Sequence, residues 1–332
     1  MRRNRPVLAA VAATLSLTVL AGCGSTANES GAGATTGATA AVPGAGLDVV
    51  SATGPVDLKT APKVTFAKTP VSTAEVARRV LAPGAGQAAT KQDTVRVRVQ
   101  IFNGTTGKLL DDGFAQGRSV DGFRLGRPDL IKGLTEGLLG AQKGARVAFT
   151  IPPAAGFGPQ GNAQLGIKGT DTMVVVADVA DVHTPLTQVD GAQAATPAGL
   201  PAVEFKAGPT KEPTVTVPKS AAPTETKQAT LIEGKGAAVQ KGQTITAQYH
   251  GLIWRDGSVF DSSWKRGAAA DFPVGSGQVI PGWDKTLVGK KVGSRVLLVI
   301  PPKDGYGSSG NAQAKITGTD TLVFVVDILD AY

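Results

Sequence analysis

The segment from Tyr249 to Trp283, YHGLIWRDGSVFDSSWKRGAAADFPVGSGQVIPGW, contains the turn and the helix start that decide the fold. Within it, Asp256-Gly257 separates two strand-like runs. Asp-Gly favours the positive φ angles of a tight hairpin, so the two runs are expected to pair as antiparallel strands. Pro281 suits the first position of a helix, and apolar side chains then recur on one helical face. The segment therefore predicts antiparallel strands followed by one short helix.

The same pattern occurs twice in the chain. Four blocks recur at an offset of 149 residues, and earlier matches such as Asp111 with Asp261 recur at an offset of 150. Such a repeat indicates a duplicated domain. A lead-in before each copy also matches, Pro62–Phe66 with Pro213–Val217, and predicts an extra N-terminal strand for each domain. The four blocks are IPP, GFG or GYG, GNAQ and GTDT, which start at residues 151, 156, 161 and 169 and again at 300, 305, 310 and 318.

Periodicity and composition set the expected fold class and boundaries. Residues 94–101 alternate apolar with polar side chains, which is typical of a half-buried strand in a sheet with one wet face. The expected class is α+β: two domains, each a mostly antiparallel twisted sheet packed on one short helix. Residues 184–200 have the composition of a linker, so the domains are expected at 47–183 and 201–332.

The first residues have the pattern of an export signal. Arg2, Arg3 and Arg5 form a positively charged start, and residues 7–20 are apolar but too few to span a bilayer stably. Leu20-Ala21-Gly22-Cys23 resembles the lipobox of bacterial lipoproteins, in which the signal is cut before the cysteine and the thiol is lipidated.

This pattern predicts a signal peptide at 1–22 and a lipidated Cys23, the chain's single cysteine, followed by a flexible tether to residue 46. The expected location is the extracytoplasmic face of a bacterial membrane. The alternative is an ordinary secretory signal with an incidental cysteine.

The second copy resembles the FKBP-type peptidyl-prolyl isomerases over about the last hundred residues. Five blocks occur in the order and spacing of that family: Tyr249-His250-Gly251, Phe260–Ser263, Val279–Trp283, Gly305-Tyr306-Gly307 and Thr321–Phe324. The resemblance implies a shallow apolar pocket that holds a proline ring against a tryptophan. Carried over to this chain, the pocket residues are Tyr249, Phe260, Asp261, Val279, Ile280, Trp283, Tyr306, Ile316 and Phe324.

Three of these residues are implied to act directly on the substrate. By resemblance, the Tyr306 hydroxyl and the Ile280 backbone N–H donate to substrate carbonyls, and Asp261 adds an electrostatic and hydrogen-bonding contribution. Rotation about an X-Pro amide crosses about 18–20 kcal/mol without breaking a bond, so no nucleophile, metal or cofactor is expected. The expected function is a prolyl isomerase that assists the folding of exported proteins, with proline-containing segments as partners.

Two positions depart from the family's pattern. Ala270 stands where a further aromatic residue is usual, and Asn311 stands where a histidine is usual. Both positions concern the affinity for macrolides, which the resemblance implies as a second class of ligand. Any one aromatic residue in a strand or helix mostly fills a core, so the assignment depends on the joint pattern. The alternative function is a non-catalytic peptide-binding chaperone or scaffold at the cell envelope, which the low aromatic content of the first copy favours for half of the protein.

The first copy lacks most of the pocket aromatics, although Asp111, Ile131 and Ile167 remain. It is expected to fold on its own with little or no isomerase activity, because apolar replacements keep a core packed. Val99, Leu110, Leu134, Phe157 and Val175 stand where the second copy has Tyr249, Phe260, Trp283, Tyr306 and Phe324.

Other functional classes find little support in the sequence. The net charge of +8 falls to +5 without the three signal arginines, and the remaining basic residues are scattered, so nucleic-acid binding is not expected. His183 and His250 are the only histidines, and no G-x-S-x-G motif follows Cys23. Neither a zinc site nor a serine hydrolase is expected.

Overall fold

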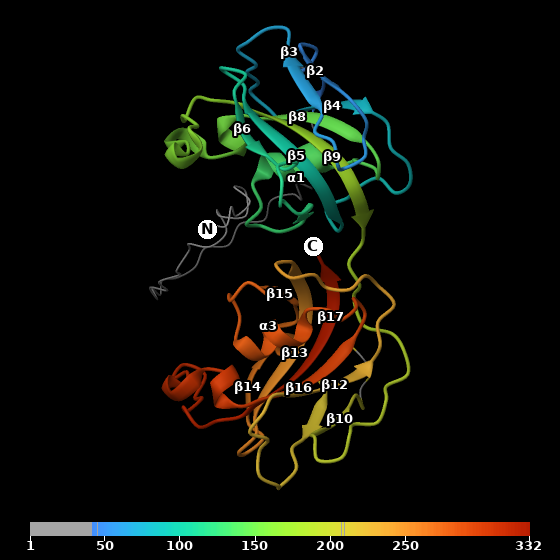
Figure 1. Cartoon of the computed structure of the whole chain (residues 1–332), viewed down its shortest axis with the longest axis vertical. Coiled ribbons are helices and arrows are strands. Elements are labelled where there is room, and N and C mark those ends of the chain that lie inside the picture. The colour runs from blue at the N-terminus through green and yellow to red at the C-terminus, as the bar shows by residue number, and fades with distance from the viewer. Residues whose placement is uncertain (1–41, 45, 207, 209) are drawn as a thin grey trace, which may run out of the picture. The chain divides into compact units, whose positions relative to one another are not determined.

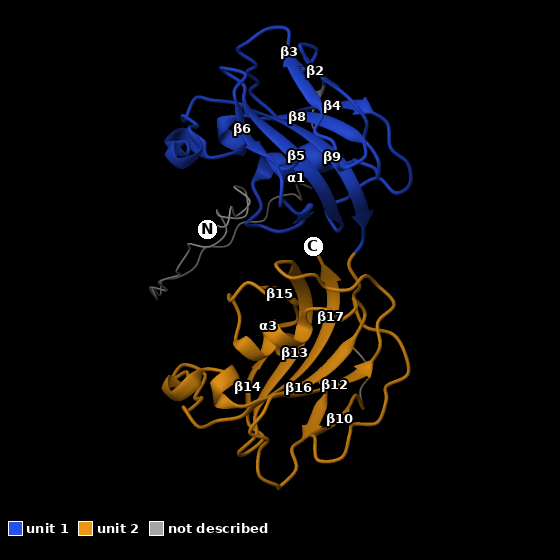
Figure 2. Cartoon of the chain, in the orientation of Figure 1, with its two compact units in different colours: residues 1–184 blue, residues 185–332 orange. Residues whose placement is uncertain are grey.

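The computed structural model describes residues 42–44, 46–206, 208 and 210–332 (Figure 1). The chain forms two compact units, of which the first ends at Thr184 and the second begins at Pro185 (Figure 2). The expected signal peptide, Cys23 and most of the tether lie outside the described residues. Among the described residues, no helix has both the length and the hydrophobicity needed to cross a membrane.

The first unit is a seven-stranded sheet with a preceding hairpin and one α-helix. Its elements are β1 (Val42–Pro43), β2 (Val50–Thr53), β3 (Lys63–Phe66), β4 (Ala77–Ala82), β5 (Thr94–Asn103), β6 (Leu109–Asp112), β7 (Asp121–Arg124), α1 (Lys132–Leu138), β8 (Arg146–Ile151) and β9 (Met173–His183). The strand order is β1-β4-β8-β9-β5-β6, and β7 also pairs with β5. Only the β1–β4 pair is parallel among these described strands.

The second unit repeats this plan with an additional helix. Its elements are β10 (Ala202–Glu204), β11 (Thr214–Thr216), β12 (Lys227–Ile232), β13 (Thr244–Ile253), β14 (Val259–Ser262), α2 (Ser263–Arg266), β15 (Ala270–Pro273), α3 (Pro281–Leu287), β16 (Arg295–Ile300) and β17 (Leu322–Ala331). The sheet order is β12-β16-β17-β13-β14, and β15 pairs with β13. The sequence predicted one helix per domain, so α2 is a correction: Ser262 and the left-handed Gly267 allow a single turn between β14 and β15.

Glycine lets the helix of each unit lie close to its sheet. Gly133 on α1 faces Ile151, and Gly282 on α3 faces Ile300. A Cβ atom at these glycines would come within 2.5 Å and 2.6 Å of the two isoleucine side chains. The repeat therefore conserves a close helix-to-sheet contact, which places Trp283 of α3 directly against the sheet.

A hairpin packs on part of the outer face of each sheet and shields it from water. The extra strand predicted for each unit is present, and it pairs with a second strand to form the hairpins β2–β3 and β10–β11. In the first unit the hairpin packs on Phe102, Ala148 and Val174, and in the second it packs on Leu252, Leu297 and Val323. The prediction of a wet face is therefore wrong over this part of the sheet, because hairpin side chains exclude water from it.

A buried arginine anchors each hairpin. Arg146 binds Asp178 and donates to the carbonyls of Gly54 and Pro55 at 2.9 Å and 2.7 Å. Arg295 binds Asp327 at 2.7 Å and 2.6 Å in the corresponding place. Paired and hydrogen-bonded in this way, the buried charges are compensated.

Candidate functional site

Five aromatic rings meet in the second unit where β13, β14, β15, β17 and α3 come together. Trp283 lies at their centre, 4.7 Å from Phe272, 5.3 Å from Phe324 and 5.8 Å from Tyr249 between ring centroids. Phe260 contacts Phe324 at 5.5 Å. All these contacts are edge-to-face, the arrangement that aromatic quadrupoles favour.

Most of the predicted site residues converge on this cluster. Trp283 is 3% exposed, and Tyr249, Phe324 and Ile316 are also buried. Phe260, Val279 and Ile280 are half-buried and pack against the same core. Tyr306 differs, since it is 37% exposed at the start of a 3-10 turn, Gly307–Ser309, and takes no part in the ring contacts of the described residues. Its side chain is therefore partly open to solvent.

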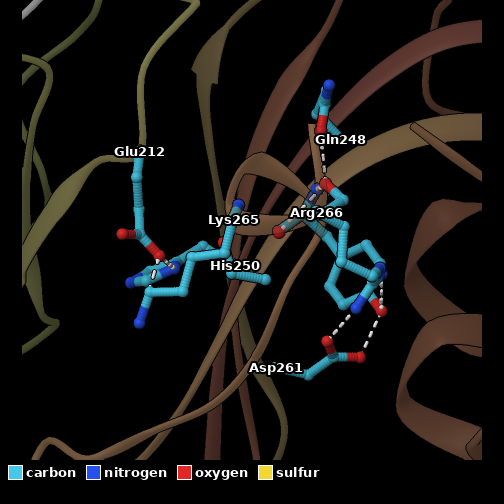
Figure 3. Close-up of polar contacts among 9 residues, drawn as sticks. Glu212, Gln248, His250, Asp261, Lys265 and Arg266 are labelled. Carbon is cyan, nitrogen blue, oxygen red and sulfur yellow. Dashed lines mark hydrogen bonds and ion pairs between the residues drawn. The ribbon is translucent and has the colours of Figure 1, made fainter. Parts of the chain in front are cut away.

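A polar triad of Tyr249, Asp261 and Arg266 borders the aromatic cluster, and Figure 3 labels Asp261 and Arg266. The Tyr249 hydroxyl donates to one oxygen of Asp261, and the Arg266 guanidinium binds the other oxygen. Arg266 also donates to the Tyr249 hydroxyl at 2.6 Å, and its guanidinium lies 5.3 Å from the centre of the tyrosine ring. The three side chains hold one another in place.

Electrostatics keeps Tyr249 and Arg266 of this triad in one protonation state. Burial, reinforced by the hydrogen bond to Asp261, raises the pKa of Tyr249 to about 12. The hydrogen bond to Tyr249 raises the pKa of Arg266 above its usual range. At neutral pH the phenol is therefore a fixed donor and the guanidinium a fixed cation.

Two carboxylates fix the loops beside α3. Asp284 accepts hydrogen bonds from the backbone N–H groups of Gly275 and Gly277 at 2.7 Å and 2.6 Å. Asp304, in the turn that leads to Tyr306, accepts from Lys285 at 2.5 Å and from Thr226 at 2.6 Å. Ile280 is the N-cap of α3, where backbone N–H groups have no partner within the helix. Its N–H is thus placed by a loop that Asp284 holds.

The sequence analysis missed four residues of this site. Phe272 supplies an aromatic ring from β15 two positions after Ala270, and Arg266 completes the triad. Asp284 and Asp304 hold the loops. The alternation of strand β15 signals Phe272, since Ala270 and Phe272 share one face of the strand. Arg266 gives no such signal, because its position depends on the turn of α2.

The first unit has a counterpart of this cluster in which aliphatic side chains replace most of the pocket aromatics. Val99, Leu134 and Val175 are fully buried, and Leu110 and Phe157 pack beside them. Asp111 still binds an arginine, Arg118, through two contacts at 3.2 Å and 3.1 Å.

A second carboxylate, Asp121, lies 3.8 Å from Arg118 in the first unit. Burial raises the pKa of Asp121 to about 6, although Arg118 lowers it. The first unit thus keeps a carboxylate–arginine pair beside its apolar core.

The sheet, the short helix and the aromatic cluster at their junction define the second unit as a prolyl isomerase fold of the FKBP type, and the first unit repeats that fold. Comparison with known families agrees: the model of the FKBP-type peptidyl-prolyl cis-trans isomerases matches residues 85–176 and 235–329. The chain belongs to this family.

Several known proteins are similar to this chain. An FK506-binding protein of Streptomyces anulatus is 40% identical over 119 residues, which are 36% of this chain and 96% of that protein. The peptidyl-prolyl cis-trans isomerase FKBP9 of Rattus norvegicus is 30% identical over 231 residues, and the match spans 69% of this chain but only 34% of the rat protein. The crystal structure of FkpA from Escherichia coli is 37% identical, with a TM-score of 0.30, over 32% of this chain and 47% of that chain.

Proposed function

We propose that the second unit catalyses the cis–trans isomerisation of X-Pro peptide bonds. The observation that carries the proposal is the ring cluster around Trp283, with Asp261 and its partners at the border. A proline ring placed against the indole would put the X-Pro amide next to Asp261 and the Ile280 N–H.

The apolar surroundings account for catalysis without bond breaking. Amide resonance is lost in the twisted transition state, so removing water from the carbonyl disfavours the planar ground state relative to that state. The Tyr306 hydroxyl and the Ile280 N–H would hold neighbouring carbonyls of the peptide. Since Asp261 already accepts from Tyr249 and Arg266, its carboxylate is held in one orientation and offers a preorganised charge.

Two buried tryptophans of the second unit provide the test. Trp283→Leu gives the site the residue that the first unit has at Leu134, and should abolish most turnover of an X-Pro peptide by the full chain. Trp254→Leu is the matched control, because Trp254 lies on the outer face of the same sheet. Each change costs about 3 kcal/mol of stability, so melting curves accompany the assay. Equal turnover in the two variants would refute the assignment.

The first unit supports a second function, the holding of peptides without catalysis. Its core contains no ring at the Trp283 position, and burial alone does not replace the directed hydrogen bond of a tyrosine hydroxyl. In this role the first unit would bind extended segments of a client while the second unit acts on them.

We also propose that the protein works outside the cytoplasm on exported clients, held to the membrane by lipid on Cys23. The support is the sequence pattern of residues 1–23. Because Cys23 is the single acylation candidate, Cys23→Ser should move the protein from the detergent-extracted membrane fraction to the soluble or secreted fraction. A Cys23→Ser protein that still sediments with membranes would refute the anchor.

A further inference from the structure

The hairpin β10–β11 packs on the sheet of the second unit, on the face opposite the candidate site. Figure 3 shows Glu212 of the hairpin loop beside His250 and Lys265, whereas Arg266 and Asp261 lie on the opposite side. Tyr249 and His250 are neighbours on β13, so their side chains leave the strand on opposite faces. The hairpin and the site therefore contact the two faces of one strand.

Glu212 is the charged contact of this hairpin. Its carboxylate lies 2.9 Å from Nδ1 of His250, without the alignment of a hydrogen bond, and 3.7 Å from Nζ of Lys265. The His250 side chain is only 3% exposed, and burial lowers its pKa despite the nearby Glu212. Near neutral pH the imidazole is uncharged, so Lys265 is the cation that Glu212 attracts.

Phe205 is the aromatic contact of the same hairpin. Its ring packs edge-to-face on Trp264 at 5.8 Å, and the Arg295 guanidinium lies 3.5 Å from the ring centre. Arg295 is anchored to Asp327. Phe205 thus connects α2 to the buried ion pair of the sheet.

Both hairpin contacts fall on α2, which has only four residues. A helix of one turn is not stable by itself, so its position depends on the groups packed against it. Trp264 and Lys265 face the hairpin, and the next residue, Arg266, binds Tyr249 and Asp261. A displacement of α2 would move Arg266 with it.

A comparison with the first unit supports this connection between the hairpin, α2 and the candidate site. Its hairpin is anchored by Arg146, but no helix corresponds to α2. In the lead-in alignment Ala61 stands where Glu212 does, and Gln100 stands where His250 does. The charged contact and the helix are therefore both confined to the unit that has the aromatic site, among the described residues.

We propose that Glu212 is a positioning residue, which holds α2 through Lys265 and thereby sets Arg266 and Asp261 for turnover. This inference rests on the proposed isomerase activity of the second unit. Glu212 lies on the opposite face of β13 from the candidate site, so its effect would be transmitted by α2.

The test uses the full chain with Glu212→Gln, which keeps the shape of the side chain and removes its charge. Glu204→Gln is the matched control, because Glu204 lies on the same hairpin and pairs with Lys206 at the surface. Glu212→Gln should lower kcat/KM roughly two- to five-fold, the range that one partly exposed ion pair supplies. Glu204→Gln should leave it unchanged.

A double-mutant cycle separates positioning from general stability. In an Arg266→Gln background, Glu212→Gln should change kcat/KM by less than about 1.5-fold, since the group through which it acts is gone. Equal losses in both backgrounds would overturn the proposal.

Amide hydrogen exchange gives a readout that does not need activity. Glu212→Gln should accelerate exchange in residues 259–267 and leave β17 unchanged. Unchanged exchange in residues 259–267 would overturn the inference. An inactive wild-type chain would refute the proposed function instead, and the exchange result would still decide whether Glu212 holds α2.

Discussion

Asp121 and Ala270 occupy equivalent places in the two sheets. Asp121 pairs with Val97 of β5, and Ala270 pairs with Ala247 of β13. Family resemblance implies an aromatic side chain at this position, which neither unit has. Two positions further along each strand both units have a phenylalanine that packs on the core, Phe123 in the first unit and Phe272 in the second. The charge of Asp121 therefore adds to the chemical difference between the two sites.

This charge should make the first unit less stable as pH rises. The folded pKa of Asp121 is about 6, above the ordinary value of 3.8, so its contribution is complete below about pH 4 and is lost as pH rises through 6. The shift corresponds to a loss of at most about 3 kcal/mol. Asp121→Asn should remove this dependence and raise the melting temperature of the first unit at pH 7.5.

Calorimetry of the full chain at pH 4.5 and pH 7.5 measures this effect, and Asp48→Asn at an exposed site serves as control. A variant that keeps the wild-type dependence on pH would show that Asp121 is ionised without cost in the folded unit.

At the scale of elements, the same helix-to-sheet contact occurs beside two sites with different side chains. Gly282 and Gly133 allow α3 and α1 to approach Ile300 and Ile151 closely. The contact fixes the position of residue 283, but it does not determine the chemistry of the side chain at that position. The helix therefore provides placement, and the side chain at one position on it provides the chemistry.

Gly282→Ala should reduce turnover because the new methyl group pushes α3 away from β16. Overpacking of this kind costs about 1–3 kcal/mol. Gly133→Ala introduces the same clash into the first unit and is the matched control. Melting measurements on the full chain should show similar destabilisation in both variants. Kinetic measurements should show a loss of turnover in the Gly282 variant alone. Equal turnover losses would mean that the two units depend on each other.

Local sequence signals predicted the elements that depend on local chemistry. The Asp256-Gly257 turn, with Gly257 at a φ of 69°, joins β13 and β14, and Pro281 begins α3 as expected. Contacts that depend on distant pairing were missed. The partner strands β2 and β10 have weak patterns of their own, and α2 is a single turn that Glu212 and Phe205 contact from the hairpin. Of the Tyr249–Asp261–Arg266 triad, Tyr249 and Asp261 were therefore predicted from the sequence and Arg266 was not.

At the scale of the whole molecule, the chain contains one fold twice, with different side chains at the two sites.

The residues between the two sheets belong structurally to the second unit: the Leu186 N–H donates to the Leu329 carbonyl at 3.0 Å, and the Ala194 N–H donates to the Leu231 carbonyl at 2.7 Å. Gln193 accepts from Arg295, and Val189 is buried. A fragment that begins at residue 201 loses these contacts, which are worth about 2–4 kcal/mol.

The last prediction concerns how activity is divided between the units. Fragments 42–184 and 185–332 should both melt cooperatively, and 185–332 should melt above 201–332. At equal concentration on one X-Pro peptide, 185–332 should retain the turnover of the full chain, and 42–184 should show little or none. The reason is that the first unit packs Leu134 and Val99 where the second has Trp283 and Tyr249. If 42–184 matched 185–332 in kcat/KM, the aromatic cluster would not be the source of catalysis, and an apolar FKBP-type sheet and helix would suffice without it.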